Sequence, residues 1–98
     1  MIDVVIRKSH NPRKKYDAVF NAKNIISFGA AGYEDFTIHK DNKRRENYIK
    51  RHGNEDWSRY NVESAAWLSR WLLWEKPNLS EAIKHANTMY KDVRFTLR

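Results

Sequence analysis

The sequence contains no cysteine, and only three glycines and two prolines among its 98 residues. Without cysteine, neither a disulfide framework nor a thiolate metal site is possible, so the fold depends on packing alone. No linker, internal repeat or low-complexity segment interrupts the chain. A chain of this length supports one hydrophobic core and not two. We therefore predict a single domain over residues 1–98.

Long hydrophobic runs are also missing. The most apolar stretch, AAWLSRWLLW, is interrupted by Arg70 and is about half as long as a membrane span. The N-terminal segment MIDVVIRKSH carries Asp3 and Arg7 where a signal peptide needs an uninterrupted apolar core. We therefore expect no membrane partner and no secretion.

Acidic residues are scarce relative to basic ones. The chain has 19 Lys and Arg against 12 Asp and Glu, a formal net charge of +7 and a pI near 9.8. A surface with this balance attracts anions over much of its area. Nucleic acid and acidic protein surfaces are therefore the favoured classes of partner.

The N-terminal third, about residues 2–29, has the pattern of β-strands. DVVIR, YDAVF and NIISFGA are rich in Val, Ile, Phe and Tyr, and the Asn11-Pro12 pair marks a turn after the first of them. Gly29 and Gly32 indicate a bend at the end of the third run. We predict an α+β fold in which a small antiparallel sheet of about three strands packs against three helices.

The segment from about residue 41 to 91 has the pattern of three helices. The first is expected to begin at the N-cap Asp41 and to end at Gly53, with cations around most of its surface. The second is expected to begin at Asn61 and to stop at Lys76, because the residue before a proline is rarely helical.

The last helix is expected to begin at Asn78, since Glu81 follows three residues later in the manner of a capping box. Its apolar residues, from Leu79 to Tyr90, recur at helical spacing. The tail VRFTLR alternates between apolar and polar residues, and so it is a candidate edge strand.

Tryptophans recur at helical spacing along the second predicted helix. We interpret Trp67 and Trp71 as core residues, because a small chain without cysteine needs large buried side chains. Trp74 and Trp57 lie nearer the ends of predicted elements and are expected at the surface. An exposed indole there would be available for stacking on a base or for holding a partner.

The basic residues gather in two places, the turn between the first two strands and the helix that begins at residue 41. Neutralising phosphates at such patches releases counterions and makes binding depend on salt. Acidic residues such as Glu46 and Glu55 offer the alternative of internal pairing, and Glu46 stands four residues before Lys50. The candidate nucleic-acid-binding residues are Arg13, Lys14, Lys15, His39, Lys40, Lys43, Arg44, Lys50, Arg51 and His52.

An enzymatic alternative rests on Asp35, His39 and Asp41. Paired carboxylates followed by a lysine are typical of metal-dependent nucleases, in which the acids hold the metal ion. In those enzymes the acids usually stand on adjacent strands, whereas here they fall in a turn and at a helix start. Capping of backbone donors by Asp35 or Thr37 is the simpler interpretation. We assign no catalytic residue, no metal site and no cofactor.

Three motifs together resemble a family of small uncharacterised proteins encoded by large DNA viruses and some bacteriophages. The motifs are KKYDAVF, FGAAGYEDFTIHKDNKRRENYIKRH and SRWLLWEKPNLSEAI, within residues 14–85. The resemblance implies a viral or phage source, and hence a location in the host cytoplasm or nucleus or inside the virion. It also implies a shared surface formed by His39, Lys40, Arg44, Arg51 and His52.

The sequence therefore predicts a small basic viral or phage protein that contacts nucleic acid, DNA rather than RNA, through backbone phosphates. A virion structural protein is one alternative, because the same basic surface suits a minor capsid or cement protein that binds acidic faces of viral proteins. A metal-dependent phosphodiesterase or nuclease is the other.

Overall fold

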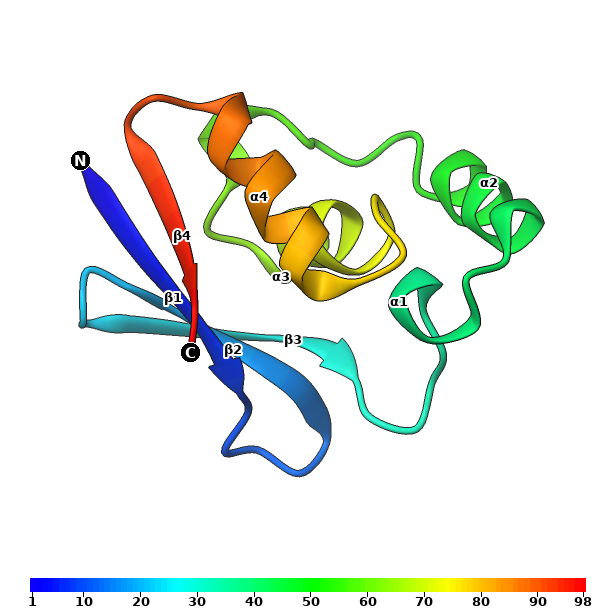
Figure 1. The fold of residues 1–98 in the computed structure, drawn as a ribbon, viewed down its shortest axis with the longest axis horizontal. Helices are drawn as coiled ribbons and strands as arrows, with labels where there is room; N and C mark the ends of the chain where they lie inside the picture. Colours follow the sequence, from blue (N-terminus) through cyan, green and yellow to red (C-terminus); the bar gives the residue numbers. More distant parts are fainter.

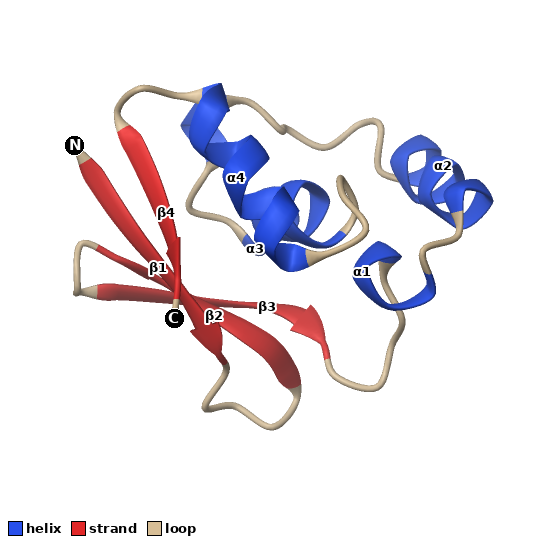
Figure 2. Cartoon of the chain, viewed as in Figure 1, coloured by secondary structure: helices blue, strands red, loops and turns tan.

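Residues 1–98, all described by a computed structural model, form a four-stranded sheet with α3 and α4 packed beside it and α1 and α2 beyond the end of β3 (Figure 1, Figure 2). The strands are β1 (Ile2–Lys8), β2 (Lys14–Phe20), β3 (Asn24–Ala30) and β4 (Val93–Leu97). Their order is β3-β2-β1-β4. β2 pairs antiparallel with both β1 and β3, and β1 pairs parallel with β4. The predicted α+β class and N-terminal strands are confirmed, and the tail is an edge strand that makes the sheet mixed.

Helical elements fill the sequence between β3 and β4. They are α1 (Phe36–His39), α2 (Asn42–Arg51), the 3-10 turn η1 (Arg59–Asn61), α3 (Ala65–Leu68), the π-helical turn η2 (Ser69–Leu73) and α4 (Leu79–Met89). The short helix α1 was not predicted, because its four residues are too few for a periodic pattern. None of these helices has the length and apolar character that crossing a bilayer requires.

Two of the predicted helix starts are confirmed. The Asp41 carboxylate accepts hydrogen bonds from the backbone N–H groups of Lys43 and Arg44, at 2.9 and 3.3 Å. The Asn78 side chain accepts one from the N–H of Glu81 at 2.9 Å. Each cap satisfies backbone donors that the first helical turn leaves free.

The predicted helix from Asn61 to Lys76 is wrong at both ends. The N-cap is Ser64, whose hydroxyl accepts a hydrogen bond from the N–H of Trp67 at 3.1 Å. Asn61 ends η1 instead, and its amide donates to the carbonyl of Asp56 at 2.7 Å. At the other end the π-helical turn stops at Leu73, several residues before the proline that was expected to end the helix.

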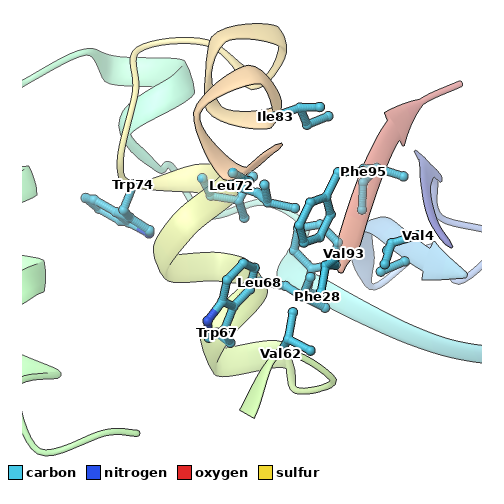
Figure 3. Close-up of a cluster of buried hydrophobic side chains, with 14 of the residues drawn as sticks. Val4, Phe28, Val62, Trp67, Leu68, Leu72, Trp74, Ile83, Val93 and Phe95 are labelled. Carbon is cyan, nitrogen blue, oxygen red and sulfur yellow. The ribbon is translucent and has the colours of Figure 1, made fainter. Parts of the chain in front are cut away.

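The core lies between the sheet and the segment from α3 to α4 (Figure 3). Trp67 is fully buried and stacks on Phe95 of β4, with ring centroids 5.7 Å apart and planes 7° apart. Leu68 and Leu72 are likewise fully buried. This arrangement confirms the core assignment of Trp67 and explains why the edge strand is held firmly.

The other tryptophans differ from expectation. Trp74 is buried, with 9% of its surface exposed, because Tyr48 of α2 covers it in a parallel stack with 4.2 Å between ring centroids. Trp71 is only half-buried, and the Arg70 guanidinium lies over its ring at 4.2 Å from the centroid. Trp57 is half-buried as well. The prediction for Trp74 is therefore wrong, whereas Trp71 packs against the core without being fully buried.

On the sheet face away from the helices, the buried carboxylate of Asp17 links the β1–β2 hairpin to β3. Asp17 accepts hydrogen bonds from the hydroxyls of Ser9 and Ser27, at 2.6 and 2.7 Å, and from the N–H of His10 at 3.3 Å. Arg7 pairs with it at 3.5 Å. Burial acts to raise the pKa of Asp17, but these hydrogen bonds outweigh burial and hold it below its ordinary value. Arg7 therefore has a structural role.

Candidate nucleic-acid interface

Helix α2 stands at the end of the molecule farthest from the loop between α4 and β4 (Figure 1). Its inner side is fixed by the Tyr48–Trp74 stack and by Arg45. The Arg45 guanidinium donates to the carbonyl of Trp74 at 2.9 Å and to the Glu75 carboxylate at 2.8 Å. Because these contacts fix the inner side, the opposite side of α2 is presented to solvent.

One carboxylate holds two guanidinium groups behind α2. Glu75 accepts from Arg45 and also from Arg70, at 2.9 Å, and Arg70 is itself buried. Burial acts to raise the pKa of Glu75, but the hydrogen bond and charge of Arg70, together with Arg45, outweigh it and lower the pKa. Both arginines are therefore structural residues, although the sequence pattern does not separate them from the surface cations.

The outer side of α2 borders a depression that we call the α2 groove. Its volume is about 610 Å³, and it lies between α2 and the connection from β3 to α1. Arg44, Asn47 and Arg51 share one wall because residues separated by three, four and seven positions project from the same side of a helix, and Lys50 stands three positions after Asn47. The lining residues are Tyr33, Glu34, Arg44, Asn47, Lys50, Arg51 and Trp74.

A second depression of about 530 Å³ continues the α2 groove inward. The two share Tyr33, Glu34, Arg51 and Trp74 as lining residues. The inner part reaches Gly29 at the end of β3 and also touches Lys15, Asp35, Tyr48 and His52. A continuous hollow thus runs from the end of the sheet to the exposed side of α2, with aromatic and cationic groups along it.

Five of the ten candidate residues carry exposed cations whose charged groups have neither a carboxylate within ion-pairing distance nor a hydrogen bond within the chain. The hairpin between β1 and β2 supplies two of them and α2 supplies three. They are Arg13, Lys14, Lys43, Lys50 and Arg51. Internal pairing, the alternative for the basic clusters, therefore does not extend to these five, and the Glu46–Lys50 pair that helical spacing permits is not formed.

Three other candidates are paired with acids. Lys15 lies 2.5 Å from the buried carboxylate of Asp35. Arg44 pairs with Glu34 at 3.1 Å, with about half of each side chain exposed. His52 Nδ1 lies 2.7 Å from Glu55. Lys15 therefore supports the wall of the hollow, whereas Arg44 lines it with part of its charge neutralised and His52 lines it with Nδ1 close to Glu55.

The remaining two candidates, His39 and Lys40, connect elements. His39 is half-buried, and its Nδ1 accepts a hydrogen bond from the N–H of Asp41 at 2.8 Å. Its ring centroid lies 5.3 Å from that of Trp74. The Lys40 ammonium donates to the carbonyls of Thr37 and Pro77, at 2.9 and 2.6 Å. Neither residue lines the α2 groove.

The two basic clusters of the sequence lie on either side of the connection from β3 to α1. On the hairpin side, Lys14 is paired with Ala30 in the sheet, and the N–H of Ala31 donates to the carbonyl of Arg13 at 2.9 Å. On the helix side, Glu34 meets Arg44. The fold therefore brings clusters far apart in sequence to the two borders of one short segment.

The carboxylates of the enzymatic alternative have other partners. Asp35 is buried, accepts hydrogen bonds from the N–H and hydroxyl of Thr37, and so caps α1 as expected. Asp41 caps α2. The chain has no group of three or more His, Cys, Asp or Glu residues placed so that it could hold a metal ion. These side chains act as helix caps.

Tyr33, Asn47 and Glu34 complete the groove, although sequence reasoning did not select them as site residues. Tyr33 is 73% exposed and follows Gly32, whose φ of +86° turns the chain. The signal available in the sequence was the GAAGYED segment, in which two glycines precede an aromatic and two acids. Which way that segment folds is set by the docking of α2.

Comparison with known proteins gives one match. No curated protein and no solved structure matches the chain. Residues 4–52 match the model of a family of unknown function, DUF5754. The matched segment runs from β1 through α2 and contains all of the candidate residues. Since the match covers half of the chain, the protein belongs to the family of unknown function DUF5754.

Proposed function

We propose that the protein binds nucleic acid through backbone phosphates, using the exposed cations of α2 and of the hairpin between β1 and β2. One observation carries the proposal: Arg13, Lys14, Lys43, Lys50 and Arg51 are exposed and have no acidic partner. Cations without internal partners are free to neutralise phosphates and release their counterions.

The nearby acids support this proposal because they are engaged elsewhere. Asp35 is taken by Lys15 and by the cap of α1, and Asp41 is taken by the cap of α2. Glu55 pairs with His52. These three carboxylates therefore form no ion pair with the exposed cations of α2, whose charges stay available to a polyanion.

The test compares two double variants that change net charge equally. Lys50→Glu with Arg51→Glu alters the α2 groove, whereas Lys91→Glu with Arg94→Glu alters exposed cations at the other end of the molecule. Affinity for labelled oligonucleotides is measured by fluorescence anisotropy at about 50 and about 200 mM salt. We expect the groove variant to lose affinity and to reduce the salt slope by roughly one for each phosphate that is no longer neutralised, with a smaller effect in the control.

Absence of binding at low salt would contradict the proposal, as would affinity that does not change with salt. Equal losses in the two double variants would contradict the location, because they would reflect net charge alone. The viral or phage source that the resemblance implies, and the preference for DNA over RNA, remain predictions. Parallel titrations with DNA and RNA of the same sequence address the second of them.

The geometry gives less support to the two alternative functions. A virion structural role would use the same basic surface, and a fixed copy number of the chain in purified particles would favour it. A metal-dependent nuclease would need Asp35, His39 and Asp41, but the two carboxylates cap α1 and α2, and His39 Nδ1 accepts a hydrogen bond from the N–H of Asp41. Unlike the nuclease alternative, the nucleic-acid proposal draws on side chains that the fold leaves free.

A further inference from the structure

We infer that the nucleic acid bound at this site is single-stranded, with one base stacked on Tyr33 and its phosphate against Lys50 and Arg51 in the α2 groove. This inference rests on the proposed function and adds to it the strand state and the contact that selects it. Its basis is the placement of an exposed aromatic ring and unpaired cations around one hollow.

The Tyr33 side chain does not contribute to the core packing or the hydrogen bonding of the fold. It belongs neither to the hydrophobic core nor to the partly buried residues that pack against the core. Its side chain forms no hydrogen bond and no aromatic pair within the chain, and 73% of its surface is exposed. A tyrosine held outside in this way keeps a large flat face that is free to stack.

The connection that carries Tyr33 is constrained. Gly32 before it has a positive φ of 86°, and the N–H of Tyr33 approaches the carbonyl of Ala30 at 3.4 Å. After it, Glu34 is tied to α2 by its ion pair with Arg44, and Asp35 is buried. Both sides of Tyr33 are therefore anchored, so the ring is offered at a defined border of the groove.

The opposite wall of the groove supplies the complementary charge. Lys50 and Arg51 are exposed in the last turn of α2 and line the groove with the amide of Asn47 between them and Arg44. Glu34 is acidic and lies in the same groove, but its pairing with Arg44 leaves the positive charge concentrated at Lys50 and Arg51. A phosphate is therefore best placed at that end of α2.

The preference for single-stranded nucleic acid follows from the stacking of a base on Tyr33. A duplex keeps its bases stacked on one another and offers the protein mainly its phosphates, so it cannot give a base face to Tyr33 without unstacking. A single strand presents base and phosphate together, and proteins bind it by combining aromatic platforms with basic grooves. The α2 groove combines both features, and its volume of about 610 Å³ accommodates a nucleotide.

The experiment uses the full chain, two variants and three oligonucleotides of equal length. The variants are Tyr33→Ala, which removes the ring, and Tyr33→Phe, which keeps it. The oligonucleotides are single-stranded oligo-dT, an abasic strand with the same phosphates, and a duplex. We expect Tyr33→Ala to weaken binding of oligo-dT about tenfold, the typical effect of losing a base-stacking ring, with little change for the abasic strand and the duplex. Tyr33→Phe should bind oligo-dT like the wild type.

Failure of the inference and failure of the proposed function give different results. If the wild type binds no oligonucleotide, both the inference and the proposed function are contradicted. If it binds the duplex as tightly as oligo-dT and Tyr33→Ala changes nothing, phosphate binding stands and the inference is overturned. A parallel loss on all three oligonucleotides would also overturn it, because a stacking contact distinguishes strands with bases from strands without them.

Discussion

Tyr48 is the residue that joins α2 to the rest of the molecule. It stacks on Trp74 and lies against the ring of His52, with 4.2 Å between centroids in both cases. Burial, helped by the charge of Glu55, raises the pKa of Tyr48 to about 12 from its ordinary value of 10.0. The phenol is therefore neutral wherever the groove is expected to work.

This shift predicts a loss of stability in alkali. A raised pKa means that the folded state holds the Tyr48 proton more tightly, so its contribution is complete below pH 10.0 and is lost as the pH rises to about 12. Tyr48→Phe should lack this part of the decline. Urea unfolding of both proteins across that range measures it, and identical pH profiles would contradict the assignment.

The ion pair between Glu34 and Arg44 predicts a gain in affinity. Glu34→Gln removes a negative charge from the α2 groove and frees Arg44, while each side chain of the pair is about half exposed. Stability should change by less than about 1 kcal/mol, since exposed pairs contribute little. Affinity for nucleic acid should rise severalfold in anisotropy titrations.

The control for this prediction is Glu63→Gln, an equal charge change at an exposed acid outside the groove. A comparable gain in both variants would show that net charge, and not the position of Glu34, governs the affinity.

At the scale of elements, the end of β3 and its connection to α1 contain two glycines in different surroundings. Gly29 has φ +76°, and a Cβ there would lie 2.8 Å from Leu73 Cδ1 and 3.3 Å from the Lys15 side chain. Gly32 has φ +86° with no atom within 4 Å of such a Cβ. Both positions disfavour a side chain through backbone conformation, but only Gly29 is also crowded.

The comparison of Gly29→Ala with Gly32→Ala separates these two effects. Gly32→Ala should cost about 1 kcal/mol of unfolding free energy, from the left-handed backbone alone. Gly29→Ala should cost about 3 kcal/mol, because overpacking against Leu73 is added. Urea denaturation of both variants provides the values, and equal losses would show that Leu73 yields without cost.

Local sequence patterns predicted those elements whose signals lie within the element. Runs rich in Val, Ile, Phe and Tyr identified the first three strands, alternation identified the tail strand, and the caps at Asp41 and Asn78 placed the starts of α2 and α4. The second helix was misplaced because Asn61 and Ser64 are both acceptable caps. The choice between them is made by tertiary packing, which buries Val62 between the two.

The candidate site was less predictable because it also depends on tertiary packing, here between residues that are far apart in the sequence. The excess of cations is evident in the sequence, but the pairs that remove some of them join distant residues. Arg44 meets a glutamate ten positions away, and Arg45 meets one thirty positions away. Adjacent arginines in α2 therefore have different roles, and only the docked helix shows which one faces the groove.

At the scale of the whole molecule, the segment that matches the family is not a complete core. Residues 4–52 contain β1 to β3, α1 and α2. The residues that cover the inner face of the sheet come later, among them Trp67, Leu68 and Leu72. Most of the apolar surface of the three strands would be open to water without them.

We therefore predict that a fragment of residues 1–52 does not fold by itself. Its circular dichroism should lack a cooperative thermal transition, and its amide resonances should be poorly dispersed, whereas the full chain should show both features. A well-dispersed spectrum for the fragment would contradict this view and would mean that the family segment is an autonomous unit.

The parallel pairing of β1 with β4 sets the order of events during synthesis. Ile2 stands opposite Val93, and Ile6 stands opposite Leu97, so β1 lacks its second neighbour until β4 has been synthesised. Until then the nascent chain carries an open sheet edge and uncovered aromatic residues. We therefore expect chaperones to be most useful to this polypeptide during that interval.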